Sequence, residues 1–398
     1  MMREENTKVV PFERNRRVPD PARVAEFAAT ARRLQSERDR SAELVARALS
    51  ETPRDRWTSL ATRPELVNSG VLDRLSMLAD ELENDPQQAL AISELATAIA
   101  DAMRDDAYPR IVVAQLRAHA WKDRARALCY VAMYDEAAHA LDRADATLLP
   151  FGTLAHDQAV VAFVRSIVLQ HLRRFDEART LLEHCRTVFH DHGDVRLVRK
   201  CSMATANLLV RRGDYRAARE ELAELVRSGD PEAIARARFA LGWCAIHLGD
   251  ADEALVQFRD AERRNRQLGS GIEAVRATYG IGCALLRLGR IDSAIERLAA
   301  ARGHFLEHAL VEEAGLSGLE LVQARMLRAE IDAAKSLAAS IVQEFAAARL
   351  SRRAVAALAY LNEAIAASRA TAETVRDVHA YITALRSDPT REFTAATN

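Results

Sequence analysis

The sequence predicts an all-α protein, a solenoid built from antiparallel helix pairs. Composition gives the first indication, because glycine (15 of 398 residues) and proline (10) are scarce while good helix formers dominate. The second is a short phrase that recurs at intervals near 40 residues, a period typical of repeat architectures. The third is length, since 398 residues exceed what one hydrophobic core usually organises, whereas stacked units grow without that limit.

The N-terminal residues are predicted to hold a disordered arm and a divergent helical region. Residues 1–20 are polar and punctuated by proline, which is typical of disorder. Asp85 is a suitable N-cap for a helix that has Pro86 in its first turn. Within the helical region, residues 21–104, we expect helices over 21–50, 71–83 and 86–104, with a loop over 50–70 that contains prolines at 53 and 64.

Six repeats are predicted over residues 105–347. Each copy has an aromatic or aliphatic anchor followed three positions later by alanine, and mostly apolar residues recur seven and ten positions after it. These offsets lie on one face of a helix. A Gly-Asp or Gly-Arg step precedes three anchors and predicts a tight turn between two helices. The anchors are Tyr134, Phe175, Tyr215, Ala251, Ile291 and Ile331, at spacings of 41, 40, 36, 40 and 40 residues.

The C-terminal residues are predicted to close the stack. Residues 348–386 are expected to form a capping helix pair, of which the last helix is more polar, as suits a terminal unit that faces water. Residues 387–398 are predicted to be a flexible tail.

The repeat resembles the tetratricopeptide repeat family. The resemblance rests on a small residue in the middle of the first helix (Gly242, Gly282), the Gly-Asp turn, the anchor and the alanines of the second helix. These units are mostly 40 residues long, whereas the family's unit has about 34, so they are similar to the long repeats of bacterial sensor and regulator solenoids. The resemblance implies a right-handed superhelix in which the first helix of each pair lines the concave surface.

No signature of an enzyme occurs in the sequence. A P-loop, a GxSxG elbow and an HExxH motif are all absent, so neither an enzyme nor a cofactor is expected. The five cysteines do not form CxxC pairs and are expected to be reduced, small apolar residues. The N-terminus lacks an apolar signal-peptide segment, and no long apolar run occurs, so we expect a cytoplasmic protein without a membrane partner.

Two groups of histidines leave a metal site as an alternative. One contains His184, Cys185, His190 and His192, and the other is the pair His304 and His308. The first group does not have the spacing of a zinc motif, and Cys185 occupies an apolar column of the repeat. The pair has the i, i+4 spacing that suits a metal, but surface histidines at this spacing also arise by chance. Solvated turn and surface residues are the favoured interpretation, and no metal is predicted.

A partner-binding surface is implied by the resemblance. The family's concave-surface positions lie 15, 12, 8, 5 and 4 residues before each anchor. In this chain these thirty positions hold seven Lys or Arg, three His and five aromatic residues but no Asp or Glu, where average composition would place about four acids. The candidate partner-binding residues are Lys122, Arg126, Tyr130, Phe163, His171, Lys200, Asn207, Arg211, Arg236, Phe239, Trp243, His247, Arg276, Tyr279 and Arg287.

This sorting predicts an interaction scaffold or adaptor that binds an acidic peptide or partner protein. Pairing of the basic residues with acids of the second helices is the structural alternative. A peptide- or ligand-responsive sensor that acts on a separate effector protein is the second functional hypothesis. Binding of single-stranded nucleic acid is a third, against which the net charge of −1 argues. Homo-oligomerisation stays open.

Overall fold

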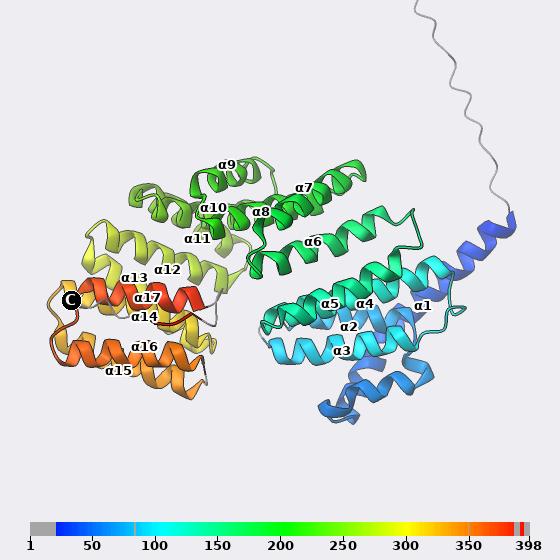
Figure 1. The fold of residues 1–398 in the computed structure, drawn as a ribbon, viewed down its shortest axis with the longest axis horizontal. Coiled ribbons are helices and arrows are strands. Elements are labelled where there is room, and N and C mark those ends of the chain that lie inside the picture. Colours follow the sequence, from blue (N-terminus) through cyan, green and yellow to red (C-terminus); the bar gives the residue numbers. More distant parts are fainter. Residues whose placement is uncertain (1–20, 83–84, 349, 386–390, 394–398) are drawn as a thin grey trace, which may run out of the picture. The chain divides into compact units, whose positions relative to one another are not determined.

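The computed structural model describes residues 21–82, 85–348, 350–385 and 391–393, and these fold almost entirely into helices (Figure 1). No strand occurs among them, in agreement with the predicted all-α class. The predicted arm over 1–20 and most of the predicted tail over 387–398 lie outside the described residues. The helices are α1 (Pro21–Glu51), α2 (Ser69–Glu81), α3 (Pro86–Ala102), α4 (Arg110–Tyr130), α5 (Tyr134–Leu148), α6 (Ala155–His171), α7 (Phe175–Asp191), α8 (Val195–Arg212), α9 (Tyr215–Val226), α10 (Pro231–His247), α11 (Ala251–Gln267), α12 (Gly271–Arg287), α13 (Ile291–Glu307), α14 (Val311–Leu327), α15 (Ile331–Ala347), α16 (Arg352–Ala366) and α17 (Ala372–Leu385), with short 3-10 helices η1 (Arg54–Thr62) and η2 (Pro64–Leu66).

Two compact units make up the chain, with their boundary between Val164 and Arg165, inside α6. In the first unit α1 packs against α2, and η1 packs against α3. The predicted loop over 50–70 is wound mostly into η1 and η2, because Trp57 and Leu60 are buried in the core of this unit. The predicted cap of α3 is confirmed, since the Asp85 carboxylate accepts a hydrogen bond of 3.0 Å from the backbone N–H of Gln88.

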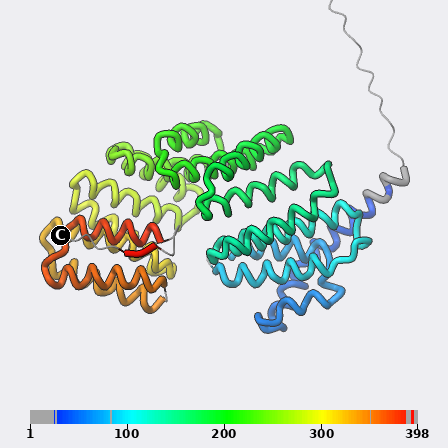
Figure 2. The backbone as a smooth tube through the Cα atoms, in the orientation of Figure 1, coloured from blue at the N-terminus to red at the C-terminus, as the bar shows by residue number. Residues whose placement is uncertain are grey.

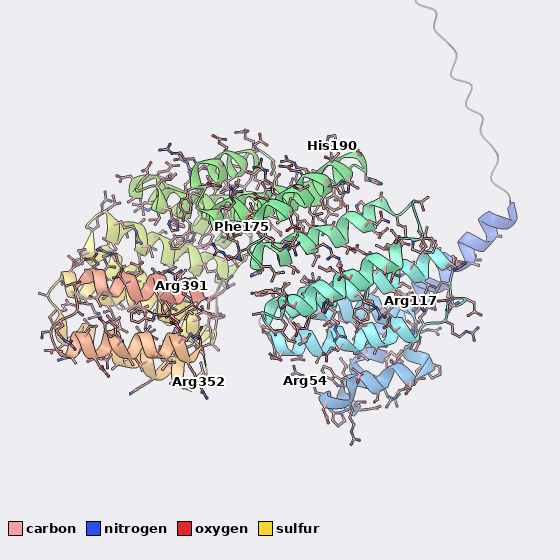
Figure 3. All side chains as sticks on the ribbon, viewed as in Figure 1. Arg54, Arg117, Phe175, His190, Arg352 and Arg391 are labelled. Carbon is pink, nitrogen blue, oxygen red and sulfur yellow. The ribbon has the colours of Figure 1, made fainter. Side chains whose placement is uncertain are left out.

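The predicted repeat register is confirmed by where the second helices begin. Each of the six anchors is the first residue of a helix, as Phe175 of α7 illustrates (Figure 3). The alanine three positions later is completely buried in every copy. These alanines are Ala137, Ala178, Ala218, Ala254, Ala294 and Ala334.

Turns between the paired helices share one backbone conformation. The residue two positions before each anchor has a positive φ in all six pairs, which closes the first helix with a left-handed residue. Glycine occupies this position in three pairs, at φ values of 85°, 80° and 70° for Gly213, Gly249 and Gly289. Alanine or arginine takes the same conformation in the other three, at Ala132, Arg173 and Ala329. The shared turn geometry reverses the chain between the two helices of each pair, and Figure 2 traces the resulting alternation of helices along the second unit.

Small residues in the first helices allow close packing of the second helices. A Cβ atom added at Gly242 of α10 would lie 2.6 Å from the ring of Phe258 in α11, closer than real carbon atoms approach. Phe258 is itself completely buried. Packing therefore requires glycine at this position. Gly242 is the small residue that was expected from the sequence in the middle of a first helix.

The last helix departs from the alternating pattern. Through α16, each helix of the second unit's later pairs packs mainly against the helices before and after it. The final helix, α17, instead packs more extensively against α14 than against α16, its neighbour in sequence. The predicted C-terminal helix pair is thus present as α16 and α17, but its two members do not form a regular further repeat.

Candidate partner-binding site

The second unit places most candidate residues on three adjacent first helices, since α8 contacts α10 and α10 contacts α12. Because consecutive candidate positions within each helix are spaced three, four, seven or eight residues apart, they share one side of that helix. We call this set the first-helix face. It consists of Lys200, Asn207 and Arg211 of α8, Arg236, Phe239, Trp243 and His247 of α10, and Arg276, Tyr279 and Arg287 of α12.

Solvent reaches the basic end groups of this face. Lys200, Arg211 and Arg236 are exposed, and Asn207 is exposed between the first two along α8. Arg236 makes no hydrogen bond or ion pair with any residue that the structure describes. The positive charge of Arg211 also acts on its neighbour His171, whose pKa is lowered to about 4, first by burial and then by this charge. The α8 and α10 part of the face is therefore electropositive.

The aromatic residues of the face are half-buried. Trp243 lies between Phe239 and Tyr279, with ring centroids 6.3 Å and 5.7 Å away, and both Phe239 and Trp243 meet the buried ring of Phe258 edge-on. Such pairs stabilise the packing beyond the area they bury. The aromatic residues thus form a packed, half-buried part of the face.

A stacked pair adds a further aromatic surface at the end of α10. The ring of His247 lies parallel to that of Tyr215, the anchor of α9, with centroids 4.3 Å apart. Burial and then the nearby charge of Arg287 lower the pKa of His247, so its neutral form is favoured.

The candidate basic residues of α12 form ion pairs with acids. Arg276 lies 2.5 Å from Glu273 and 3.3 Å from Glu313. Arg287 lies 3.5 Å from Glu320 and donates a hydrogen bond to the carbonyl of Cys283. These acids come from α12 and α14, both first helices, and not from the second helices that the structural alternative named. The sequence pattern missed these acids because none of them occupies one of the five positions sampled before each anchor.

Four candidate residues belong to the first unit and are described there by themselves. Lys122 lies 2.9 Å from the buried carboxylate of Asp123, and Arg126 pairs with Asp80 and Asp123. Tyr130 is 42% exposed, and Phe163 is half-buried. The basic side chains of this unit therefore neutralise a buried acid, a role that the candidate pattern alone does not reveal.

A cavity lies outside the predicted face, beside the short helix α9. This helix has 12 residues, whereas α7, α11, α13 and α15 each have 17. The missing turns leave an open cavity of about 800 Å³ against α10 and α11, lined by side chains of both charges that include Arg219, Arg238 and Glu253. The spacing of 36 residues between Tyr215 and Ala251 is the sequence signal for this feature.

The histidine groups considered for metal binding make ordinary local contacts. His190 lies 3.6 Å from Asp191, and the ring of His308 is 2.8 Å from the carbonyl of His304, one turn earlier. No group of three or more potential ligands is placed to hold a metal among the residues described.

The cysteines are free thiols, and four of the five are buried. Burial raises the pKa of Cys185 and of Cys201 to about 12, which suppresses the reactive thiolate. These thiols act as small apolar residues of the core. Within the same described residues, no helix is both long and apolar enough to cross a bilayer.

Comparisons with known proteins agree with this architecture. Residues 203–268, which cover the second half of α8 and all of α9, α10 and α11, match the tetratricopeptide repeat family. A search of curated proteins found no match.

Solved structures of similar fold are distant in sequence. One is a signal transduction ATPase with numerous domains (STAND) from Pyrococcus horikoshii that has a tetratricopeptide repeat sensor. It is 12% identical to this chain with a TM-score of 0.58, and the match covers 89% of this chain and 53% of that protein. The chain thus spans about half the length of that protein. The apo form of RapI is 11% identical (TM-score 0.54, 86% and 98% covered). The apo form of the quorum sensor NprR from B. thuringiensis is 10% identical (TM-score 0.53, 86% and 99% covered).

At such low identity these structures establish the fold alone. Together they show a helical solenoid of the tetratricopeptide-repeat type, in which residues 203–268 match the family's repeat.

Proposed function

We propose that this chain is a protein-interaction scaffold or adaptor that binds an acidic peptide, or an acidic segment of a partner protein, on the first-helix face. The exposed basic residues of α8 and α10 carry the proposal. Lys200, Arg211 and Arg236 project from two adjacent helices, and no acid occupies the sampled positions of either helix. Arginine suits carboxylates because its planar guanidinium forms two parallel hydrogen bonds.

The half-buried rings beside these cations support an apolar component in the partner. Phe239 and Trp243 are fixed by packing on Phe258, so a partner would meet a preformed surface and lose little entropy in ordering it. An acidic segment with one or two large apolar side chains matches this arrangement of charge and aromatic surface.

The structure narrows the candidate residues that the proposal uses. Arg276 and Arg287 have acidic partners in the chain, as do Lys122 and Arg126, so binding a partner there would require breaking an ion pair. We assign the main role to Arg236, which pairs with no described residue, to Lys200 and Arg211 because their side chains are exposed, and to the neighbouring aromatic residues. His247 would add a neutral ring at the edge.

Selection from a random peptide library on the purified full-length chain tests this proposal. Peptides enriched in Asp, Glu and aromatic residues are expected from the wild type, and Arg211→Glu/Arg236→Glu should lower their affinity roughly a hundredfold. A matched control is Arg259→Glu/Arg290→Glu, which reverses two exposed charges on the second-helix side of the unit. Equal binding by the wild type and the Arg211/Arg236 variant would rule out the first-helix face as the site.

A regulatory sensor that acts on a separate effector is the second candidate. The favouring observation is the fold shared with NprR, a quorum sensor, over most of the chain. In that case peptide binding should change the radius of gyration measured by small-angle scattering, whereas a passive scaffold would keep its profile.

A further inference from the structure

Helix α17 lies on a surface of α14 that continues the first-helix face. We call this surface of α12 and α14 the α17 seat. Leu316 and Leu319 of α14 lie 15 and 12 residues before the anchor Ile331, the register that Arg236 and Phe239 occupy in α10. Both leucines are buried, at 6% and 0% exposure, in one hydrophobic cluster with residues of α17. The last helix therefore covers on α14 the side that α8 and α10 leave to solvent (Figure 1).

The helix that covers this side is amphipathic. Val375, Val378 and Ile382 are at most 2% exposed and share the cluster with the leucines of α14. On the opposite side of α17, residues such as Arg376 and Asp377 are exposed. A short amphipathic helix laid on apolar side chains at a spacing of three and four residues is a recurrent mode of peptide recognition.

Polar contacts join α17 to two other helices. The Nε2 atom of His379 lies 3.1 Å from the hydroxyl of Tyr279 in α12 and 3.9 Å from the carboxylate of Glu320 in α14. Glu320 is only 5% exposed, and Arg287 lies 3.5 Å from it on its other side. The α17 seat thus has a buried polar centre as well as an apolar rim.

This polar centre makes the seat weaker than an entirely apolar one. The Oε2 atom of Glu320 is buried and has no hydrogen-bond partner among the described residues. Burying such an atom costs free energy that apolar burial must offset. The turn into α17 adds to this cost, because Ser368 has a positive φ of 56° without being glycine.

We propose that α17 is a displaceable occupant of this seat, and that the surface of α12 and α14 beneath it docks an amphipathic helix of a partner protein. The partner helix would carry apolar residues at the spacing of Val375, Val378 and Ile382. It would also place a histidine or another hydrogen-bond donor opposite Glu320 and Tyr279. This site is apolar around the buried ion pair of Glu320 and Arg287, so it differs from the exposed basic residues of α8 and α10 and can fail or succeed independently of them.

A peptide supplied in trans to the full-length chain tests the proposal. The probe is a fluorescein-labelled synthetic peptide of residues 371–385. The wild-type chain should bind it weakly, because its own α17 competes at an effective concentration near the millimolar range. Val378→Asp in the full-length chain should weaken its own α17 and bind the wild-type peptide at least about tenfold more tightly.

Matched controls isolate the seat. Arg376→Ala alters the exposed side of α17 and should leave peptide binding at the wild-type level. A peptide that carries His379→Ala should bind the Val378→Asp chain several-fold less tightly than the wild-type peptide. Equal peptide binding by the wild-type and Val378→Asp chains, with helical circular dichroism retained, would overturn the proposal.

Hydrogen exchange of the wild-type chain gives a second readout that needs no substitution. Independent opening of α17 predicts that its amides exchange roughly tenfold faster than those of α14, and that excess peptide speeds the exchange of α17 while α14 stays protected. If α17 and α14 exchange at one common rate, with or without peptide, α17 is a fixed part of the fold and the proposal is wrong.

Discussion

Arg302 and Glu344 form a buried ion pair between the second helices α13 and α15. The Nη2 atom of Arg302 lies 2.5 Å from Glu344, and its Nη1 atom donates a hydrogen bond of 2.9 Å to the carbonyl of Ala314. Arg302 is only 7% exposed, so the guanidinium joins three successive helices of the second unit.

Loss of this arginine should strongly destabilise the chain. Arg302→Ala would leave the carboxylate of Glu344 half-buried without its cation, and we expect the free energy of unfolding to fall by about 3 kcal/mol. The double variant Arg302→Met/Glu344→Gln removes both charges and should recover part of the loss. Urea denaturation followed by circular dichroism measures both values. A double variant no more stable than Arg302→Ala would show that packing, and not the charge pair, is responsible.

The left-handed turn residues predict opposite effects at equivalent positions. Ala329 has a φ of 61°, a conformation that costs a residue with a Cβ atom about 1 kcal/mol, so Ala329→Gly should stabilise the chain. Gly249→Ala places a Cβ atom in the same conformation, at φ 80°, and should destabilise it by a similar amount. The midpoint of thermal unfolding compares the two variants. Shifts in the same direction would contradict the turn geometry.

Close packing at Gly242 predicts a second asymmetry among glycines. Gly242→Ala drives a methyl group into the ring of Phe258 and should cost about 1–3 kcal/mol of stability. Gly303→Ala is the matched control, because Gly303 lies within α13 and an added Cβ atom meets nothing within 4 Å. That variant should gain about 0.5–1 kcal/mol from helix propensity. Chemical denaturation of both proteins tests the contrast.

The lowered pKa of His171 predicts a loss of stability in acid. Its pKa is about 4 in the folded chain against 6.5 for the free group, so the unfolded chain binds the proton more tightly. The free energy of unfolding should therefore fall as the pH falls from about 6.5 to about 4. His171→Gln removes this contribution and should flatten the pH profile.

A titration of His171 by NMR also reports on the proposed site. Arg211→Ala should raise the pKa of His171, because the arginine's positive charge is the second cause of the shift. Binding of an acidic peptide beside Arg211 should raise it in the wild type for the same reason. An unchanged pKa in the presence of saturating peptide would place the peptide elsewhere.

The sequence predicted the helix pairs well because their determinants are local and periodic. The alanine three residues after each anchor marks the face of the second helix that is buried. This face can be read from a few neighbouring residues in the sequence. The turn glycines likewise reveal a backbone requirement within a few residues. Ala132 and Ala329 adopt the same conformation without any local signal, so only the register of the repeat points to them.

The candidate site was harder to predict because it depends on contacts between distant residues. Nothing near Arg287 in the sequence indicates that Glu320 lies beside it, and the position of α17 over α14 brings His379 to Tyr279 across 100 residues. The unit boundary inside α6 also arises from how neighbouring helices pack, which periodicity does not encode.

The shortened helix α9 has a consequence for engineering the chain. Although α9 ends at Val226, the next helix begins at Pro231 with its buried positions in register, and Ala254 and Phe258 of α11 are fully buried. Helix α9 is thus shorter by more than one turn, yet the buried positions of the following helix pair keep their register. The exposed turn at Gly229, with its positive φ of 77°, is therefore a natural position at which to insert a tag, an epitope or a fluorescent reporter.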